Sequence, residues 1–142
     1  MDRLPLEGLG AADAHLGRPV PLPRVPLPLT RWVDVLALGS YAVEVAWNLD
    51  DTRASRPGRL ALYVGTGPPP ERPLGEPVAL GRYAHRTTAL EDAEPSLRPV
   101  HELSWCDDGL YLRVTGQGPW ALDDLVAIAD SVGAETRLHA PG

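Results

Sequence analysis

Prolines in the first 30 residues constrain this 142-residue chain more than any other feature. Six of the 16 prolines lie there, and five of them are separated by only one or two Val, Leu or Arg residues. Each proline fixes its φ at about −65° and favours extended backbone in the residue before it. We therefore expect residues 1–30 to be extended. Because the intervening residues are mostly apolar, this segment should pack on the rest of the chain rather than form a disordered linker.

Apolar residues begin to alternate with polar or small ones at Trp32, which is the period-2 pattern of a half-buried strand. The side chains expected on one side of the longest alternating stretch are Tyr41, Val43, Val45, Trp47 and Leu49. Gly39-Ser40 suits a two-residue hairpin turn that would pair Leu36 with Val43 and Trp32 with Trp47. Residues 60–64 predict a third strand, and residues 78–84 predict extended backbone after three prolines at positions 68–70.

The register of a later hairpin can be predicted residue by residue. Residues 100–106 and 110–115 flank an Asp108-Gly109 turn, which would place Trp105 opposite Leu112 and Leu103 opposite Val114. The other face would then pair Ser104 with Arg113 and Glu102 with Thr115. A slip of one residue would turn the apolar side chains outwards, so burial fixes this register.

Residues 121–132 change to helical spacing. The apolar stripe consists of Leu122, Leu125, Val126, Ile128, Ala129 and Val132, and Gly133 stands where a left-handed residue commonly ends a helix. A helix this short is not stable alone in water. We expect it to cover the sheet face that carries Leu103 and Trp105.

Together these elements predict an α+β fold with an antiparallel sheet of about five to seven strands. One carboxyl-terminal helix packs on the sheet, and a Pro-rich extended amino-terminal segment lies along an edge. The connections are too short to carry crossover helices, which favours antiparallel pairing throughout. We divide the chain into residues 1–30, the Pro-rich extended segment packed on the domain, and residues 31–142, a single sheet-and-helix domain.

The order of these signatures resembles a bacterial domain family of unknown function. That family is found at the carboxyl end of exported, anti-sigma-factor-like and sporulation-associated proteins, and it is distantly similar to the sheets of lipoprotein carriers and envelope-stress regulators. The matching pieces are the prolines from Pro19 to Pro28, the stretch 42–47, Leu103-Ser104-Trp105 with the stretch 108–112, and the helical stretch 122–132. The resemblance implies an exported location and a binding or sensory role, and it supplies no catalytic residues.

Two features depart from that family. Its members usually carry Ser just before the closing helix, where this chain has Ala121, and a capping oxygen there is worth ~1 kcal/mol. They also follow a signal peptide or a membrane anchor, and the start of this sequence has neither pattern. On that ground we expect a cytoplasmic location, with no transmembrane segment.

Composition narrows the classes of partner. The formal net charge is −6 and all 13 basic residues are Arg, so we expect no nucleic-acid partner. The single cysteine, Cys106, excludes an internal disulfide and a multi-cysteine zinc site.

The amino-acid bias has two explanations. Lys and Phe are missing and Asn and Ile occur once each, which is typical of a GC-rich genome. The scarcity of Asn, Gln, Cys and Met makes heat tolerance a second hypothesis.

Several motifs have both a functional and a purely structural interpretation. Residues 116–121 match the Gly-x-Gly-x-x-Ala dinucleotide fingerprint, but the preceding strand belongs to a hairpin. Only about twenty residues follow Ala121 for the parallel strand and the acidic residue that the fingerprint needs. His101 and Glu102 should point to opposite faces, and Asp107-Asp108 suit a turn. His15, His85 and His139 could meet only in three dimensions. We expect Cys106 to be a small buried or half-buried side chain that fills space in the packing. We expect Trp32, Trp47 and Trp105 to lie in the core.

The Pro23-Arg24-Val25-Pro26 stretch has the Pro-x-x-Pro form that docks in aromatic grooves, although its Val and Leu content favours packing on its own domain.

No residue is assigned a catalytic, cofactor-binding or metal-binding role, and no cofactor is expected. We predict a non-catalytic binding or sensory module that holds a peptide, an apolar ligand or a partner protein in a concavity between helix and sheet. The alternatives are a small metal-dependent or hydrolytic enzyme using His85, His101 and carboxylates, and a structural homo-oligomer.

Overall fold

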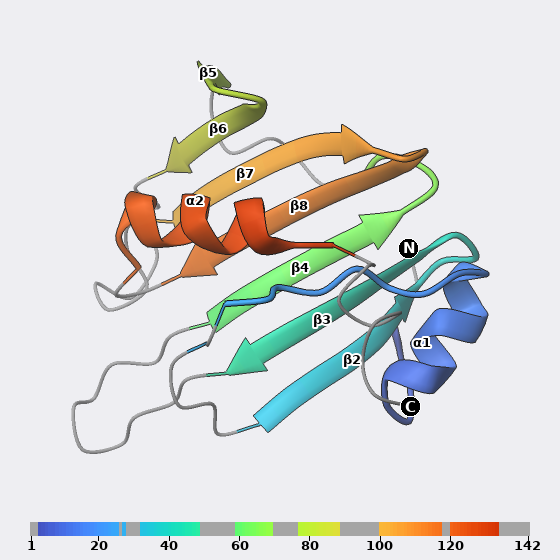
Figure 1. Cartoon of the computed structure of the whole chain (residues 1–142). Coiled ribbons are helices and arrows are strands. Elements are labelled where there is room, and N and C mark those ends of the chain that lie inside the picture. The colour runs from blue at the N-terminus through green and yellow to red at the C-terminus, as the bar shows by residue number, and fades with distance from the viewer. Residues whose placement is uncertain are drawn as a thin grey trace.

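The structure is a computed structural model that describes residues 3–25, 27, 32–48, 59–69, 77–88, 100–117 and 120–133. The described elements are eight strands and two helices (Figure 1). In chain order they are β1 (Arg3–Pro5), α1 (Leu9–Leu16), β2 (Trp32–Leu38), β3 (Ala42–Asn48), β4 (Arg59–Gly65), β5 (Val78–Leu80), β6 (Tyr83–Thr88), β7 (Val100–Asp107), β8 (Leu110–Gln117) and α2 (Leu122–Ser131).

All eight strands form one sheet in the order β1-β2-β3-β4-β8-β7-β6-β5, and every described pair is antiparallel. The antiparallel sheet with a carboxyl-terminal helix is as predicted, but the expected strand number of five to seven is too low. Residues 3–5 add an edge strand. The stretch 78–84, expected to be one extended piece, is divided between β5 and β6 by a turn at Gly81, whose φ is +60°. Glycine adopts this conformation without the steric cost that a Cβ brings.

The amino-terminal segment differs from the prediction that residues 1–30 are extended throughout. Residues 3–5 do form a strand, but α1 occupies Leu9–Leu16 and ends at Gly17, whose φ of +85° is left-handed. The physical reason is that no proline lies between Pro5 and Pro19, so Leu, Ala and Asp residues are free to form two helical turns. From Arg18 to Val25 the described backbone has no helix, and Leu22 makes an isolated bridge to Gly133.

The β2–β3 hairpin is shifted by one residue from the predicted register. Val35 pairs with Val45 and Val33 with Trp47, and a three-residue loop replaces the two-residue turn. The expected register would have placed Asp34 opposite Val45 on the apolar face. In the structure Asp34 pairs with Ala46 and shares a face with Asn48, whose Nδ2 donates to Asp34 Oδ2 at 3.2 Å. β3 is also buried on both faces from Ala42 to Ala46, not half-buried as expected.

The β7–β8 hairpin has the predicted register. Trp105 pairs with Leu112, Leu103 with Val114, Ser104 with Arg113, and Glu102 with Thr115. At the turn, Asp108 and Gly109 have φ values of +51° and +78°. Two consecutive positive φ values are typical of the tight type I′ turn, whose twist matches that of the flanking strands.

Helix α2 packs on β7 and β8, as its apolar stripe predicts. Leu125, Ile128 and Ala129 are buried in one cluster with Leu103 and Trp105. The expected left-handed residue at Gly133 is wrong: α2 ends at Ser131, Val132 is extended, and the Gly133 N–H donates to the Leu22 carbonyl at 3.2 Å. Neither described helix has the length and apolar character that a bilayer crossing needs.

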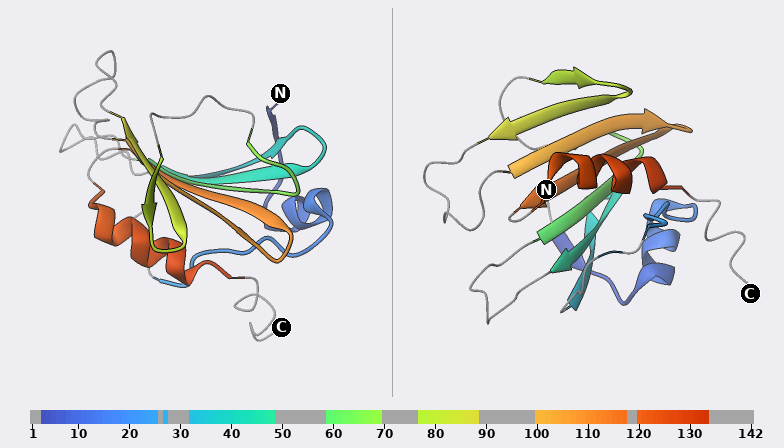
Figure 2. Two further views of the ribbon diagram at one scale, coloured as in Figure 1. Left: turned by 90° about the horizontal axis from the view of Figure 1, so that it is seen from above. Right: turned by 60° about the vertical axis from the view of Figure 1, so that its left-hand side comes forward.

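Both helices lie on the same side of the sheet (Figure 2). We call this side the helix face, defined by the row Val43, Val64, Leu112 and Trp105. The backbone of residues 18–25 crosses this face between α1 and α2 instead of following a sheet edge (Figure 1). Leu22, Val25 and Leu27 pack against the same core, which includes Val20. The helix face is therefore covered by three separate pieces of chain.

The opposite face of the sheet, the second face, carries charged side chains that are almost fully buried. Glu44 is 3% exposed and its Oε1 lies 3.0 Å from Arg59 Nη2. Glu102 lies 3.4 Å from Arg86, and the Arg113 guanidinium stands 5.3 Å from the centre of the Tyr63 ring. Buried charges need such partners because their desolvation is costly.

Replacement of Gly116 by Ala tests the docking of α2. A Cβ at Gly116 would lie 2.9 Å from both methyl groups of Leu125 and 3.1 Å from Trp120 Cγ. We expect the free energy of unfolding, measured in urea, to fall by about 1–3 kcal/mol, which is usual for overpacking. The matched control is Gly10→Ala, because a Cβ on that helical glycine meets nothing within 4 Å. The control should be neutral or slightly stabilising, and an equal loss in both variants would contradict the described packing.

Candidate functional site

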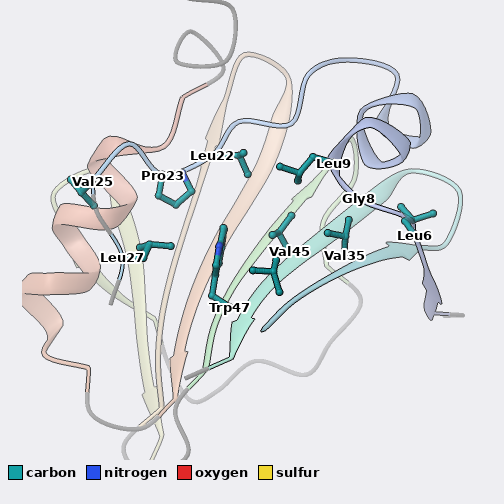
Figure 3. Close-up of a pocket in the computed structure, with 11 residues that line it drawn as sticks. Leu6, Gly8, Leu9, Leu22, Pro23, Val25, Leu27, Val35, Val45 and Trp47 are labelled. Carbon is teal, nitrogen blue, oxygen red and sulfur yellow. The ribbon is translucent and has the colours of Figure 1, made fainter. Parts of the chain in front are cut away.

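An apolar pocket of about 820 Å³ lies on the helix face beside α1 (Figure 3). Its floor comes from β2 and β3, and its walls come from the start of α1 and from the Pro-rich segment. The described lining residues are Leu6, Gly8, Leu9, Leu22, Pro23, Val25, Leu27, Val33, Val35, Val45 and Trp47. None of them is charged. The volume falls within the roughly 300–1,000 Å³ of small-molecule sites.

The floor of the pocket follows from the hairpin register. Because Val35 pairs with Val45 and Val33 with Trp47, all four side chains share the helix face and form a continuous apolar strip. Within this strip, the Trp47 ring stands between the two valines Val35 and Val45 and the Pro-rich wall (Figure 3). The register first predicted would have turned Val33 and Val35 to the second face and brought Asp34 to the floor. The apolar character of the floor therefore depends on the three-residue loop.

The Pro-rich wall is held by hydrogen bonds at every second residue. The Val20 N–H donates to Asp13 Oδ1 at 2.9 Å, and the Arg24 N–H donates to Ser131 Oγ at 3.0 Å. Between them, the Leu22 carbonyl accepts from Gly133 N–H at 3.2 Å. Prolines occupy the positions between these residues and have no N–H to satisfy. These hydrogen bonds attach the wall to both helices. The pyrrolidine rings restrict the φ angles of its prolines before any ligand binds.

The opposite wall is tied to the sheet. The Leu6 N–H donates to the Val35 carbonyl at 2.8 Å, which continues the pairing of β1 with β2 and places Leu6 and Leu9 at the edge of the pocket. Val33, at the open side, is 47% exposed, whereas Val45 on the floor is 1% exposed. The pocket therefore has a buried end and a side that is open to solvent.

A second hollow, of about 550 Å³, lies on the other side of the Pro-rich segment, towards the β7–β8 turn. Its charged lining residues are Arg18, Arg24, Asp107 and Asp108. Arg18 donates to the Asp108 carboxylate at 2.6 Å and to the Asp108 carbonyl at 2.9 Å. Arg24 Nε donates to the Ser131 carbonyl at 3.1 Å. Both cations are already used in holding the segment, so this hollow is a weaker candidate for a ligand site.

His85 and His101, which are 16 residues apart in the sequence, meet on the helix face between β6 and β7. His85 Nε2 lies 3.2 Å from His101 Nδ1, and the two rings are stacked at 5.4 Å between centroids. Burial, and then the neighbouring His85 imidazole, lower the pKa of His101 from its ordinary value. Glu102 points to the second face, as predicted, and pairs there with Arg86. Among the described residues, no three His, Cys, Asp or Glu side chains come close enough to hold a metal ion together.

The remaining sequence candidates take ordinary structural places. Asp107 ends β7, and Asp108 and Gly109 form the turn. Cys106 is exposed on the second face beside that turn, so the expectation that it is a buried or half-buried filler is wrong. His15 Nε2 lies 2.9 Å from the Gly39 carbonyl. His139 lies outside the described residues.

The tryptophans and the Pro-x-x-Pro stretch also have definite places. Trp105 is in the core, as predicted, and packs edge-on against Tyr83, whereas Trp47 is only half-buried and lines the pocket. The side chain of Trp32 lies outside the described residues, as does Pro26. Arg24 and Val25 pack on their own domain, which is the expected alternative to docking in another protein's groove.

Comparisons with protein-family models, with curated proteins and with solved structures found no match to this chain. Its candidate sites are therefore interpreted from their own geometry.

Replacement of Ser131 by Ala tests how the pocket wall is held. The Ser131 hydroxyl accepts from Arg24 N–H and donates to the Ile128 carbonyl at 2.7 Å. We expect hydrogen exchange of the Arg24 amide, followed by NMR, to become about fivefold faster, corresponding to about 1 kcal/mol for one lost hydrogen bond. The Val20 amide, which Asp13 holds, should be unaffected. Ser40→Ala in the exposed β2–β3 loop is the control. Unchanged exchange of the Arg24 amide in Ser131→Ala would contradict the hydrogen bond between Arg24 N–H and Ser131 Oγ.

Proposed function

We propose that this chain is a non-catalytic binding module that holds a small uncharged apolar molecule in the pocket between the Pro-rich segment, α1 and strands β2 and β3. One observation carries the proposal: no described side chain that lines the pocket is charged, the Trp47 indole N–H is the one polar group among these described side chains, and the pocket has the volume of a small-molecule site. Burial of apolar surface would supply the affinity, at about 25 cal/mol per Å² removed from water.

The charge of the ligand follows from the lining and from the chain as a whole. A carboxylate or ammonium group would find no described charged partner in the pocket, and an unpaired charge is costly to remove from water. The formal net charge of −6 further disfavours anions. An aliphatic alcohol, an ester or a terpenoid-like molecule fits this chemistry better than a free fatty acid.

The shape of the pocket favours a small molecule over a peptide or a partner protein. Bound peptides commonly use backbone hydrogen bonds along a free strand edge. The pocket instead lies on the face of β2 and β3. β3 is paired along its length with β2 and β4, and β1 pairs with Leu36–Leu38 of β2, whereas Trp32–Asp34 have no described partner strand on that side. A preformed wall also reduces the entropy that binding must remove, which is the advantage of a preorganised site.

The structural homo-oligomer has less support from the described sheet edges. The two edge strands, β1 and β5, have three residues each, and β1 ends at Pro5. Short edge strands and prolines limit pairing with other molecules. The enzyme alternative has one favourable observation, the contact between His85 and His101, which lies on the other side of β4 and β8 from the pocket.

Filling the pocket tests the proposal. We expect 1-decanol to displace the uncharged dye N-phenyl-1-naphthylamine from the protein, and decanoate to do so several-fold less well. Val35→Trp adds an indole on the pocket floor and should weaken decanol binding at least tenfold. Val78→Trp makes the same change at a strand valine that is 63% exposed and does not line the pocket, so it should leave binding within twofold of wild type.

Two results would contradict this proposal. One is equal binding of decanol by both Trp variants, which would place the ligand elsewhere. The other is absence of saturable binding by wild-type protein while circular dichroism shows it to be folded.

A further inference from the structure

Three polar atoms converge on one point of the helix face at β6 and β7. Thr87 Oγ1 lies 2.9 Å from His85 Nε2 and 3.1 Å from His101 Nδ1, and the two ring nitrogens are 3.2 Å apart. The strand register brings them together: Thr87 pairs directly with His101, and His85 is two residues before Thr87 on the same face. The two imidazoles are half-buried and Thr87 is exposed, so solvent reaches the cluster.

Hydrogen bonds can occupy only two sides of this triangle at a time. Each imidazole nitrogen has a single in-plane position, occupied either by a hydrogen or by a lone pair. Each of the two nitrogens nevertheless has two partners at hydrogen-bond distance. At most two of the three contacts can be hydrogen bonds at the same time. A cation at the centre would instead use both nitrogen lone pairs and an oxygen lone pair together.

We propose that His85 Nε2 and His101 Nδ1, assisted by Thr87 Oγ1, form a binding site for a divalent transition-metal ion that prefers imidazole, such as Zn²⁺ or Ni²⁺. Ligand bonds of about 2.0–2.1 Å place two nitrogens about 2.9 Å apart at a 90° angle and about 3.4 Å apart at the tetrahedral angle. The observed 3.2 Å lies between these values. The spacing of the two nitrogens therefore matches that of two ligands on one ion.

The surroundings suit a cation that exchanges with solvent. Imidazole binds metal in its neutral form. Arg86 and Glu102, the charged residues on the neighbouring positions of the two strands, belong to the second face and pair with each other there. With two imidazoles and one hydroxyl from the protein, water would complete the coordination shell. Such a site binds more weakly than a closed structural zinc site, which has four protein ligands.

The test is titration of the full-length, tag-free protein with Zn²⁺ or Ni²⁺ alone, by calorimetry and by ¹⁵N NMR of the histidine rings. We expect one ion per chain, with the largest shifts at His85 Nε2 and His101 Nδ1. Two variants each replace the binding nitrogen by an amide at a similar position: His85→Gln for Nε2 and His101→Asn for Nδ1. Each should weaken binding at least tenfold while far-UV circular dichroism stays unchanged.

The matched control replaces the other two histidines together, by His15→Gln and His139→Gln. This double variant should bind metal as wild type does. The proposal is overturned if wild-type protein binds neither ion below about 1 mM, or if His85→Gln and His101→Asn bind as wild type does. Loss of binding in the control alone would also overturn it, because the ion would then lie elsewhere. None of these outcomes depends on the apolar pocket.

Discussion

The backbone of residues 18–25 is the constraint on which the arrangement of this domain depends. Three of its eight residues are prolines, which have no N–H group. The Val20 and Arg24 N–H groups, the Leu22 carbonyl and the Arg18 side chain bond to α1, to the end of α2 and the residues after it, and to the β7–β8 turn. A segment without regular structure can cross an apolar face only if its backbone polar groups find partners, and the proline spacing and these hydrogen bonds help to meet that requirement. The segment thereby becomes a wall of the pocket instead of a loop.

The two candidate sites occupy different parts of one face. The pocket belongs to β2, β3 and α1, and the histidine pair belongs to β6 and β7, with β4 and β8 between them. α2 packs on β7 and β8, and the last turn of α2 also holds the pocket wall through Ser131. Because Tyr83 of β6 donates a hydrogen bond to Asp130 in that same turn, the strand that carries His85 is linked physically to the wall.

The amino-acid sequence predicts best where burial allows a single solution. In the β7–β8 hairpin, Leu103, Trp105, Leu112 and Val114 can share a face in only one register, and that register is found. In the β2–β3 hairpin the expected register puts Leu36 on the inner face but also Asp34, whereas the observed register puts Val33 and Val35 there. The charge of Asp34 is the sequence signal for the observed register, which needs a three-residue loop in place of the two-residue turn expected at Gly39-Ser40. Helix α1 was missed because its Pro-free stretch is short and lies within a Pro-rich segment.

The sites were harder to predict than the fold. A concavity between helix and sheet was expected, but the pocket lies beside α1 and the Pro-rich segment, which depends on contacts between residues more than 100 positions apart, such as Arg24 with Ser131. The meeting of His85 and His101 depends on the register of β6 against β7, across a connection whose length sets no register. The resemblance to an exported domain family, and the binding or sensory role it implies, stay predictions.

The central claim, that the Pro-rich wall and the β2–β3 floor enclose a ligand pocket, is tested most directly by NMR of protein with ¹³C-labelled Leu and Val methyl groups. We predict nuclear Overhauser contacts from bound decanol to the methyl groups of Leu22, Val35 and Val45, and none to Leu103 or Val114 in the closed core. Contacts to Leu103 and Val114, or contacts to the floor without any to Leu22, would contradict the account.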